Sequence, residues 1–157
     1  MRPRVDDLDR DILKCLIEDA RMPAAEIARR IGDVPPRTVR SRLAGLLDSG
    51  LVSIHAGAVP EALGFGIRAD IVIDVDPGKM NDVAARLCEL DQVCYVALST
   101  GDFDLSAAFV TTDIESFRTF VTETIHKIPG IARTRVNVLT KVFKRSCDWP
   151  FPDQLPW

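Results

Sequence analysis

The 157-residue sequence lacks the features that mark membrane and secreted proteins. Its longest segment without formal charge is 12 residues, from Ser49 to Pro60, and two glycines interrupt it. A helix that crosses a bilayer needs about 20 apolar residues, so no membrane span is predicted. The N-terminus runs directly into charged residues, without the apolar stretch of a secretory signal, and a cytoplasmic location is therefore expected.

Cysteine and histidine are scarce, and their spacing argues against metal and redox chemistry. The four cysteines form no C-x-x-C pair, and neither His55 nor His126 stands beside one, so no metal site and no cofactor are predicted. Cys15, Cys88 and Cys94 fall in apolar segments and are predicted to be reduced core thiols. The sequence contains no phosphate-binding glycine loop, dinucleotide fingerprint or nucleophile elbow. An enzyme is therefore not predicted.

Charge and hydrophobic periodicity divide the chain into two halves. Apolar residues recur at helical spacing in residues 1–64 and begin to alternate after Gly66. Acids and bases balance in the first half, whereas the second half has thirteen acids against ten bases. Domains are expected at 1–64 and 65–145, followed by a tail at 146–157 that is rich in proline and aromatic residues. The tail is predicted to pack on a subunit surface, with disorder as the alternative.

The first half is typical of a winged helix-turn-helix domain. Helices are predicted at about 7–20, 23–31 and 36–48, with a short turn before the third. Apolar residues at 51–54 then predict a strand. Two helices joined by a short turn, with a supporting helix before and a strand after, form a geometry that reads DNA.

The third predicted helix carries the residues best suited to contact DNA. Residues 29–43 hold five arginines and a single acid, Asp33, although neither half is basic overall. Arg40 and Arg42 flank the polar face, where their guanidinium groups are expected to contact phosphates. The residues opposite the apolar stripe, which are predicted to reach base edges, are Arg37, Thr38, Ser41, Ala44 and Gly45. An ordinary solvated arginine face is the alternative.

The second half predicts a β-α-β-β-α-β order. Strands are predicted at 67–75, 93–100, 105–111 and 133–143, with a helix between the first two strands and a second helix, capped by Asp113, before the last. Right-handed crossovers turn this order into a ferredoxin-like antiparallel sheet with both helices on one face. The fold class is therefore α+β. The uncovered face is expected to be an apolar patch that packs against another subunit, with residues such as Tyr95, Ala97, Leu139 and Phe143.

Several short segments occur together in an order and at a spacing typical of one protein family. They are Leu8-Asp9, Asp19-Ala20-Arg21, Glu26-Ile27-Ala28, Thr38-Val39, Arg42-Leu43, Ser49-Gly50-Leu51-Val52, Leu63-Gly64, Gly101-Asp102-Phe103-Asp104 and Ile128-Pro129-Gly130-Ile131. Over almost its whole length the chain resembles the Lrp/AsnC family, the feast/famine transcriptional regulators. The resemblance implies double-stranded DNA as a partner, an amino acid as a small-molecule effector, dimers built through the sheets, and assembly of dimers into octamers.

The turn between the second and third predicted strands is the expected effector site. Its residues by themselves require only a tight hairpin. The family resemblance implies that this hairpin borders an amino-acid pocket, formed here by Thr100, Gly101, Asp102, Phe103 and Asp104. A carboxylate side chain suits the ammonium group of such a ligand, and backbone N–H groups suit its carboxylate. Gly101 is also expected to need a backbone conformation that other residues avoid.

Two alternative functions stay open at this point. Sirohaem decarboxylases, which act on a tetrapyrrole, resemble the same two-domain scaffold, but residues 53–59 lack the paired arginines of those enzymes. The other alternative is an effector-binding protein with a weak DNA-binding half. It arises because the turn at 32–36 lacks the serine with which the family usually caps the third helix, and Pro36 supplies no side-chain acceptor.

Overall fold

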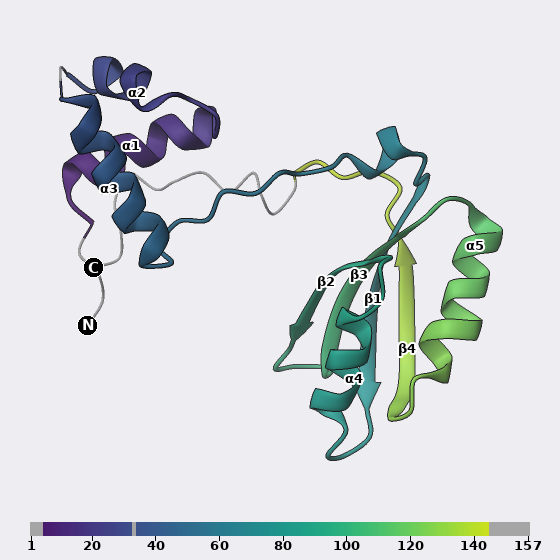
Figure 1. Ribbon diagram of the computed structural model, residues 1–157. Helices are drawn as coiled ribbons and strands as arrows, with labels where there is room; N and C mark the ends of the chain where they lie inside the picture. The colour runs from purple at the N-terminus through teal and green to yellow at the C-terminus, as the bar shows by residue number, and fades with distance from the viewer. Residues whose placement is uncertain (1–4, 33, 145–157) are drawn as a thin grey trace. The chain divides into compact units, whose positions relative to one another are not determined.

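The computed structural model describes residues 5–32 and 34–144, which form two compact units (Figure 1). The first unit extends to Ala56, and the second covers residues 57–143. The tail predicted at 146–157 lies outside the described residues. Each unit has its own hydrophobic core and is described separately.

Backbone hydrogen bonds attach the segment after Ala56 to the second unit. The 3-10 helix η1 (Pro60–Leu63) ends at Gly64, which has a φ of +90° that favours glycine. The N–H of Phe65 then donates to the carbonyl of Pro60 at 2.9 Å, and the N–H of Gly66 donates to the carbonyl of Thr112 at 3.2 Å. The change in hydrophobic periodicity near Gly66 therefore lies inside the second unit.

Three helices form the first unit, each ending within two residues of its predicted range. They are α1 (Asp7–Glu18), α2 (Ala24–Arg30) and α3 (Pro36–Asp48). A reciprocal capping box begins α1: Asp6 Oδ1 accepts from the N–H of Asp9 at 2.9 Å, and Asp9 Oδ2 accepts from the N–H of Asp6 at 3.2 Å. Pro36 begins α3 without a side-chain cap, as the turn sequence predicts.

The three helices of the first unit enclose one small core. Ile12 of α1, Ile27 of α2 and Val39 of α3 are fully buried. Cys15 packs in the same cluster, and burial raises the pKa of its thiol. This core holds one side of α3 against the other two helices, so the opposite side of α3 is exposed.

The strand predicted after α3 does not form. Leu51, Val52 and Ile54 have no regular secondary structure, and Leu51 and Ile54 are exposed. A strand requires a hydrogen-bonded partner, and no strand of the described chain pairs with this segment. Within the described residues the first unit is therefore a helix-turn-helix domain without a wing strand.

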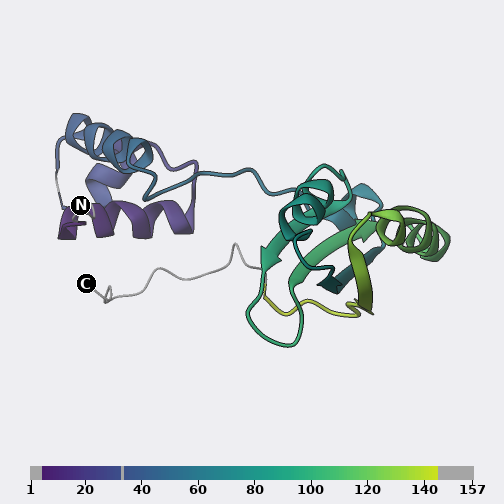
Figure 2. The same cartoon turned by 90° about the horizontal axis from the view of Figure 1, so that it is seen from below.

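The second unit is a four-stranded antiparallel sheet with its helices on one face (Figures 1 and 2). Its main elements are β1 (Ile67–Val75), α4 (Met80–Cys88), β2 (Val93–Leu98), β3 (Leu105–Thr111), α5 (Ile114–Thr119) and β4 (Ile131–Val138). After α5 the chain continues as a π-helix and a 3-10 helix, at Phe120–Thr124 and Ile125–Lys127. The strand order β2-β3-β1-β4 confirms the predicted βαββαβ topology and the α+β class.

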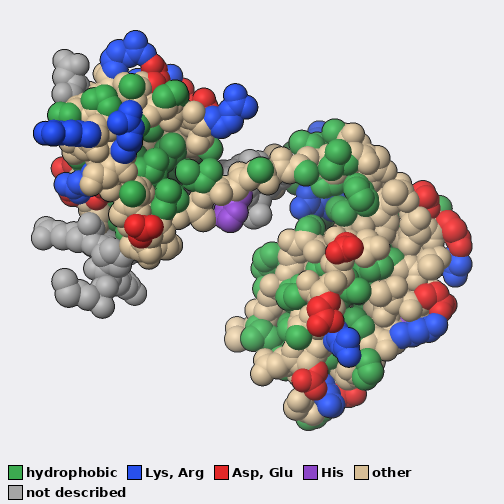
Figure 3. All heavy atoms as spheres, viewed as in Figure 1, with side chains coloured by type: hydrophobic (Ala, Val, Ile, Leu, Met, Phe, Trp, Pro, Cys, Tyr) green, Lys and Arg blue, Asp and Glu red, His purple; other side chains and the backbone are tan. Residues whose placement is uncertain are grey.

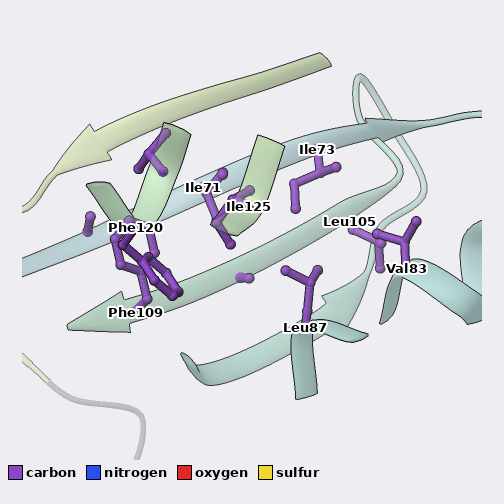
Figure 4. Packing of buried hydrophobic residues seen from close by; sticks show 11 residues of the cluster. Ile71, Ile73, Val83, Leu87, Leu105, Phe109, Phe120 and Ile125 are labelled. Carbon is purple, nitrogen blue, oxygen red and sulfur yellow. The ribbon is translucent and has the colours of Figure 1, made fainter. Parts of the chain in front are cut away.

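Alternate residues of the central strands build the core of the second unit, and Figure 4 shows their packing. Ile71 and Ile73 of β1 and Phe109 of β3 are fully buried beneath the helices. The ring centroid of Phe109 lies 5.0 Å from that of Phe120. Asp113 caps α5 by accepting from the N–H of Ser116 at 2.8 Å.

The open face of the sheet mixes charged, polar and apolar residues, so the prediction of an apolar patch is wrong. By strand register this face includes Arg68, Asp70, Val72, Asp74, Tyr95, Ala97, Ser106, Arg133 and Arg135. The guanidinium of Arg135 lies 3.6 Å from a carboxylate oxygen of Asp74. Opposite charges on β1 and β4 thus compensate each other. β4 also ends at Val138, earlier than predicted, which leaves Phe143 outside the sheet.

Two of the three described cysteines are not core residues. Cys15 is buried, whereas Cys88, at the end of α4, and Cys94, in β2, are exposed. Cys94 lies where the register of the edge strand β2 shifts, and its Sγ donates to the carbonyl of Ala108 at 3.3 Å. Among residues 5–32 and 34–144, no helix has the length and hydrophobicity needed to cross a membrane.

Candidate DNA-binding helix and effector hairpin

The exposed side of α3 brings together the residues predicted to contact DNA. Arg37, Arg40, Ser41 and Gly45 are exposed, and Thr38 and Arg42 are half-buried. Arg37, Thr38, Ser41 and Arg42 line one shallow hollow on this side of the helix. Figure 3 shows Lys and Arg side chains projecting from the surface of the helical unit. Hydroxyl groups and guanidinium groups on one helix face can donate to base edges and phosphates.

The five arginines of residues 29–43 differ in their partners, which the sequence did not reveal. Arg29 forms an ion pair with Glu26, one turn earlier in α2. Arg30 lies 2.8 Å from Glu18 of α1. No ion pair with Arg37 or Arg40 occurs among the described residues.

Arg42 is held by the capping box of α1. Its Nη1 donates to Asp6 Oδ2 at 2.7 Å and lies 3.3 Å from Asp9 Oδ1. The hydrogen bond from the N–H of Asp9, together with the Arg42 guanidinium, lowers the pKa of the Asp6 carboxyl. The same pair of carboxylates raises the pKa of Arg42. Arg42 thus joins α3 to α1 in addition to lining the hollow.

The β2–β3 hairpin places the predicted effector residues at one end of the sheet. Thr100, Gly101 and Asp102 are exposed, and Phe103 and Asp104 are half-buried. The N–H of Ser99 closes the hairpin by donating to the carbonyl of Asp104 at 2.9 Å.

Asp104 also bonds to β1 through both its backbone and its side chain. Its N–H donates to the carbonyl of Ile73 at 3.0 Å, and its Oδ2 accepts from the N–H of Val75 at 2.8 Å. The carboxylate predicted to bind a ligand therefore also fixes the hairpin to the sheet.

Gly101 is not required by the backbone of the hairpin, so that expectation is wrong. Its φ lies outside the left-handed region, and a Cβ added there would meet no atom within 4 Å. The glycines with positive φ include Gly78 and Gly130, in other turns of the second unit. At Gly101 an alanine is compatible with both the conformation and the available space.

Arg135 is a residue of the hairpin region that sequence reasoning missed. Its Nη2 donates to the carbonyl of Asp102 at 3.3 Å, while the guanidinium also faces Asp74. The register brings Arg135 opposite Val72 on the open face. The alternation of polar residues in β4 indicates that Arg135 lies on the open face, but only the pairing of β4 with β1 places Arg135 beside the hairpin.

Two family models match the chain and together span both units. A model described as the Lrp/AsnC ligand binding domain matches residues 69–149, and one described as an AsnC-type helix-turn-helix domain matches residues 5–47. The chain belongs to the Lrp/AsnC family. Membership in the Lrp/AsnC family confirms the resemblance seen in the sequence. It assigns the helix-turn-helix to the first unit and the ligand-binding domain to the second.

Individual relatives of the Lrp/AsnC family match nearly the full length. HTH-type transcriptional regulator FL11 of Pyrococcus abyssi is 32% identical, over 96% of this chain and 99% of its own. A transcriptional regulator of Neisseria meningitidis, solved as a complex with L-methionine, has a TM-score of 0.86 and 27% identity, and covers 94% of this chain and 97% of that chain. A feast or famine regulatory protein of M. tuberculosis, also solved with L-methionine, has a TM-score of 0.83 and 26% identity, covering 91% of this chain and 97% of that chain.

These relatives bear on the alternatives left open by the sequence. Each is named as a transcriptional or feast or famine regulator, and the first unit carries the family's helix-turn-helix. The chain is therefore a transcriptional regulator of the Lrp/AsnC family, and the decarboxylase alternative is not favoured.

Proposed function

We propose that the chain is a non-enzymatic regulator that binds double-stranded DNA as a dimer, with α3 of each subunit in a major groove. Arg37 and Arg40 carry this proposal, because they are exposed on α3 and have no ion-pair partner among the described residues. Arg37, Thr38, Ser41 and Gly45 reach base edges, and Arg40 contacts a phosphate. We further propose a cytoplasmic location, which is consistent with a DNA-binding regulator.

Substitution of single arginines tests the placement of α3. Arg40→Ala should weaken binding to the duplex upstream of the protein's own gene and to an unrelated duplex alike, and should reduce the salt slope by about 0.9 per lost phosphate contact. Arg37→Ala should change the preferred sequence, at a cost of about 1–3 kcal/mol on the preferred duplex. Arg29→Ala is the matched control, because Glu26 already neutralises Arg29. Unchanged affinity and preference in both the Arg37 and Arg40 variants would place the DNA contact elsewhere.

We further propose that an amino acid binds at the β2–β3 hairpin and modulates assembly and DNA binding. The hairpin region offers the carboxylates of Asp102 and Asp104 for an ammonium group and the guanidinium of Arg135 for a carboxylate. A zwitterionic ligand matches both charges. The two structural neighbours solved with L-methionine support this ligand class.

Calorimetry of the full chain tests the effector proposal. L-Methionine is the first probe and D-methionine is the matched control, because the two differ only in the position of the charged groups around one carbon. The remaining amino acids follow in a thermal-shift screen, in which ligand at about 100 times its Kd stabilises the folded state by about 2.7 kcal/mol. Absence of heat and of any shift across the whole set would remove the amino-acid effector.

We also propose that the open face of the sheet forms a homodimer, and that contacts at the hairpins assemble dimers into an octamer. Val72 is half-buried near the centre of this face, between Ser106 and Arg135 in register. Val72→Glu should convert the assembly to monomers, because a buried dimer interface would then have to enclose a longer, charged side chain in place of an apolar one. Thr119→Glu, on the exposed side of α5, is the control. Sedimentation that shows the same mass for both variants would exclude the sheet as the dimer face.

A further inference from the structure

One nitrogen of the Arg42 guanidinium contacts both carboxylates of the α1 capping box, while the side chain stays partly exposed. Both Asp6 and Asp9 contact the same nitrogen, Nη1, at 2.7 and 3.3 Å. The Asp9 side chain is only 6% exposed, whereas that of Arg42 is 42% exposed. The buried carboxylate of Asp9 holds the guanidinium through Nη1, while the Arg42 side chain as a whole stays partly exposed.

The outward part of the guanidinium keeps its hydrogen-bonding capacity. Arginine has five N–H donors in a rigid plane, and the contacts of Arg42 within the described residues use Nη1 alone. The N–H groups of Nε and Nη2 therefore remain available to donate hydrogen bonds. Arg42 lines the hollow that also includes Arg37, Thr38 and Ser41, on the side of α3 that meets DNA in the proposed function.

We propose that Asp6 and Asp9 orient Arg42 so that Nε and Nη2 bind a DNA phosphate, in a chain from carboxylate to guanidinium to phosphate. This inference rests on the proposed DNA binding by α3. Asp6 and Asp9 act as positioning residues. They hold one rotamer of a long side chain before DNA arrives, so less conformational entropy is lost on binding.

The arrangement reverses the sign expected from simple electrostatics. An acid near DNA repels phosphate, so its removal ordinarily strengthens binding. If Asp6 and Asp9 position Arg42, their removal weakens binding instead. The variant Asp6→Asn/Asp9→Asn is suited to this question because asparagine is as good an N-cap as aspartate, and its amide oxygens can still accept the capping-box hydrogen bonds.

The experiment compares full-chain D6N/D9N with D7N on the duplex upstream of the protein's own gene, over a series of salt concentrations. Asp7 is in the same helical turn, is 98% exposed and pairs with Arg10 rather than Arg42, so D7N is the control for loss of an acid. D6N/D9N should bind about tenfold more weakly than wild type, with a salt slope reduced by about 0.9 for each bound α3. D7N should bind at least as tightly as wild type.

Two outcomes overturn the inference. The first is that D6N/D9N binds DNA as tightly as D7N does, with the salt slope of the wild type. R42K keeps the charge but has no planar fork, and wild-type affinity in R42K is the second contradictory result. If thermal unfolding shows that D6N/D9N does not fold, R42K and the single variant D6N replace it in the experiment. A wild-type chain that binds no duplex overturns the proposed function itself, whereas these variant results overturn only the role of the two acids.

Discussion

Asp104 connects the stability of the hairpin with its proposed ligand, and two substitutions separate these roles. Its Oδ2 accepts from the N–H of Val75 at 2.8 Å. Asp104→Ala removes both the acceptor and the charge. Asp104→Asn keeps an acceptor for Val75 and removes only the charge. The pair therefore distinguishes a hydrogen bond that holds the hairpin from a charge that binds an ammonium group.

The expected loss of stability follows from that one bond. Removal of the partner of a half-buried N–H costs about 1–3 kcal/mol. In a domain of roughly 60–100 residues, each kcal/mol lowers the Tm by about 4–8 °C. Asp104→Ala should therefore lower the Tm of the second unit by about 4–24 °C, and Asp104→Asn should lower it by less than about half of that amount.

Thermal unfolding without ligand and calorimetry with L-methionine provide the two measurements. We expect both variants to lose amino-acid binding, but only Asp104→Ala to show the full expected decrease in Tm. Equal losses of Tm in the two variants would refute the reasoning, because the carboxylate charge would then hold the hairpin. A wild-type Tm in Asp104→Ala would also refute it, since the bond to Val75 would contribute nothing.

Three further perturbations test the fold of the two units. Gly130→Ala should destabilise the second unit by more than about 1 kcal/mol in chemical denaturation, because φ is +98° and the new Cβ would lie 2.7 Å from Cβ of Lys79; a stability equal to wild type would contradict the turn geometry. Phe109→Ala should cost about 3–5 kcal/mol, measured by the denaturant midpoint, and a cost below about 1 kcal/mol would contradict its packing. The lowered pKa values of Asp6 and Asp113 predict that stability is full above the usual 3.8 and falls as pH drops below it, which circular dichroism during acid titration would show; constant stability down to about pH 2 would contradict both caps.

Local signals in the sequence predicted most element boundaries. Pro36 begins α3 as predicted, and Asp113 caps α5 as predicted. β1 and β3 match their predicted ranges, because alternation of apolar residues is a direct consequence of having one buried face. Such signals act between residues a few positions apart, so they can be recognised without knowledge of the fold.

Two of the incorrect predictions concern features that depend on a partner segment. Residues 51–54 have strand-forming side chains, but no strand of the described chain pairs with them. The open face seemed apolar from Tyr95 and Ala97, yet the register adds charged residues of β1 and β4 to the same surface. Hydrophobic pattern specifies which residues face each side of a strand, whereas pairing decides which neighbours share that side.

The sequence by itself determined the three helices of the first unit, the order of elements in the second unit and the family, and it predicted both candidate sites. Only the tertiary structure decided which partners the charged groups of these sites contact. Arg42 meets Asp6 across 36 positions of the chain, and Arg135 meets Asp102 across 33. Arg42, predicted to contact phosphate, also binds Asp6 and Asp9, and Asp104, predicted to contact the ligand, also accepts from the N–H of Val75. The hydrophobic periodicity of the sequence does not predict these contacts, because they depend on how helices and strands pack and on the length of the side chains.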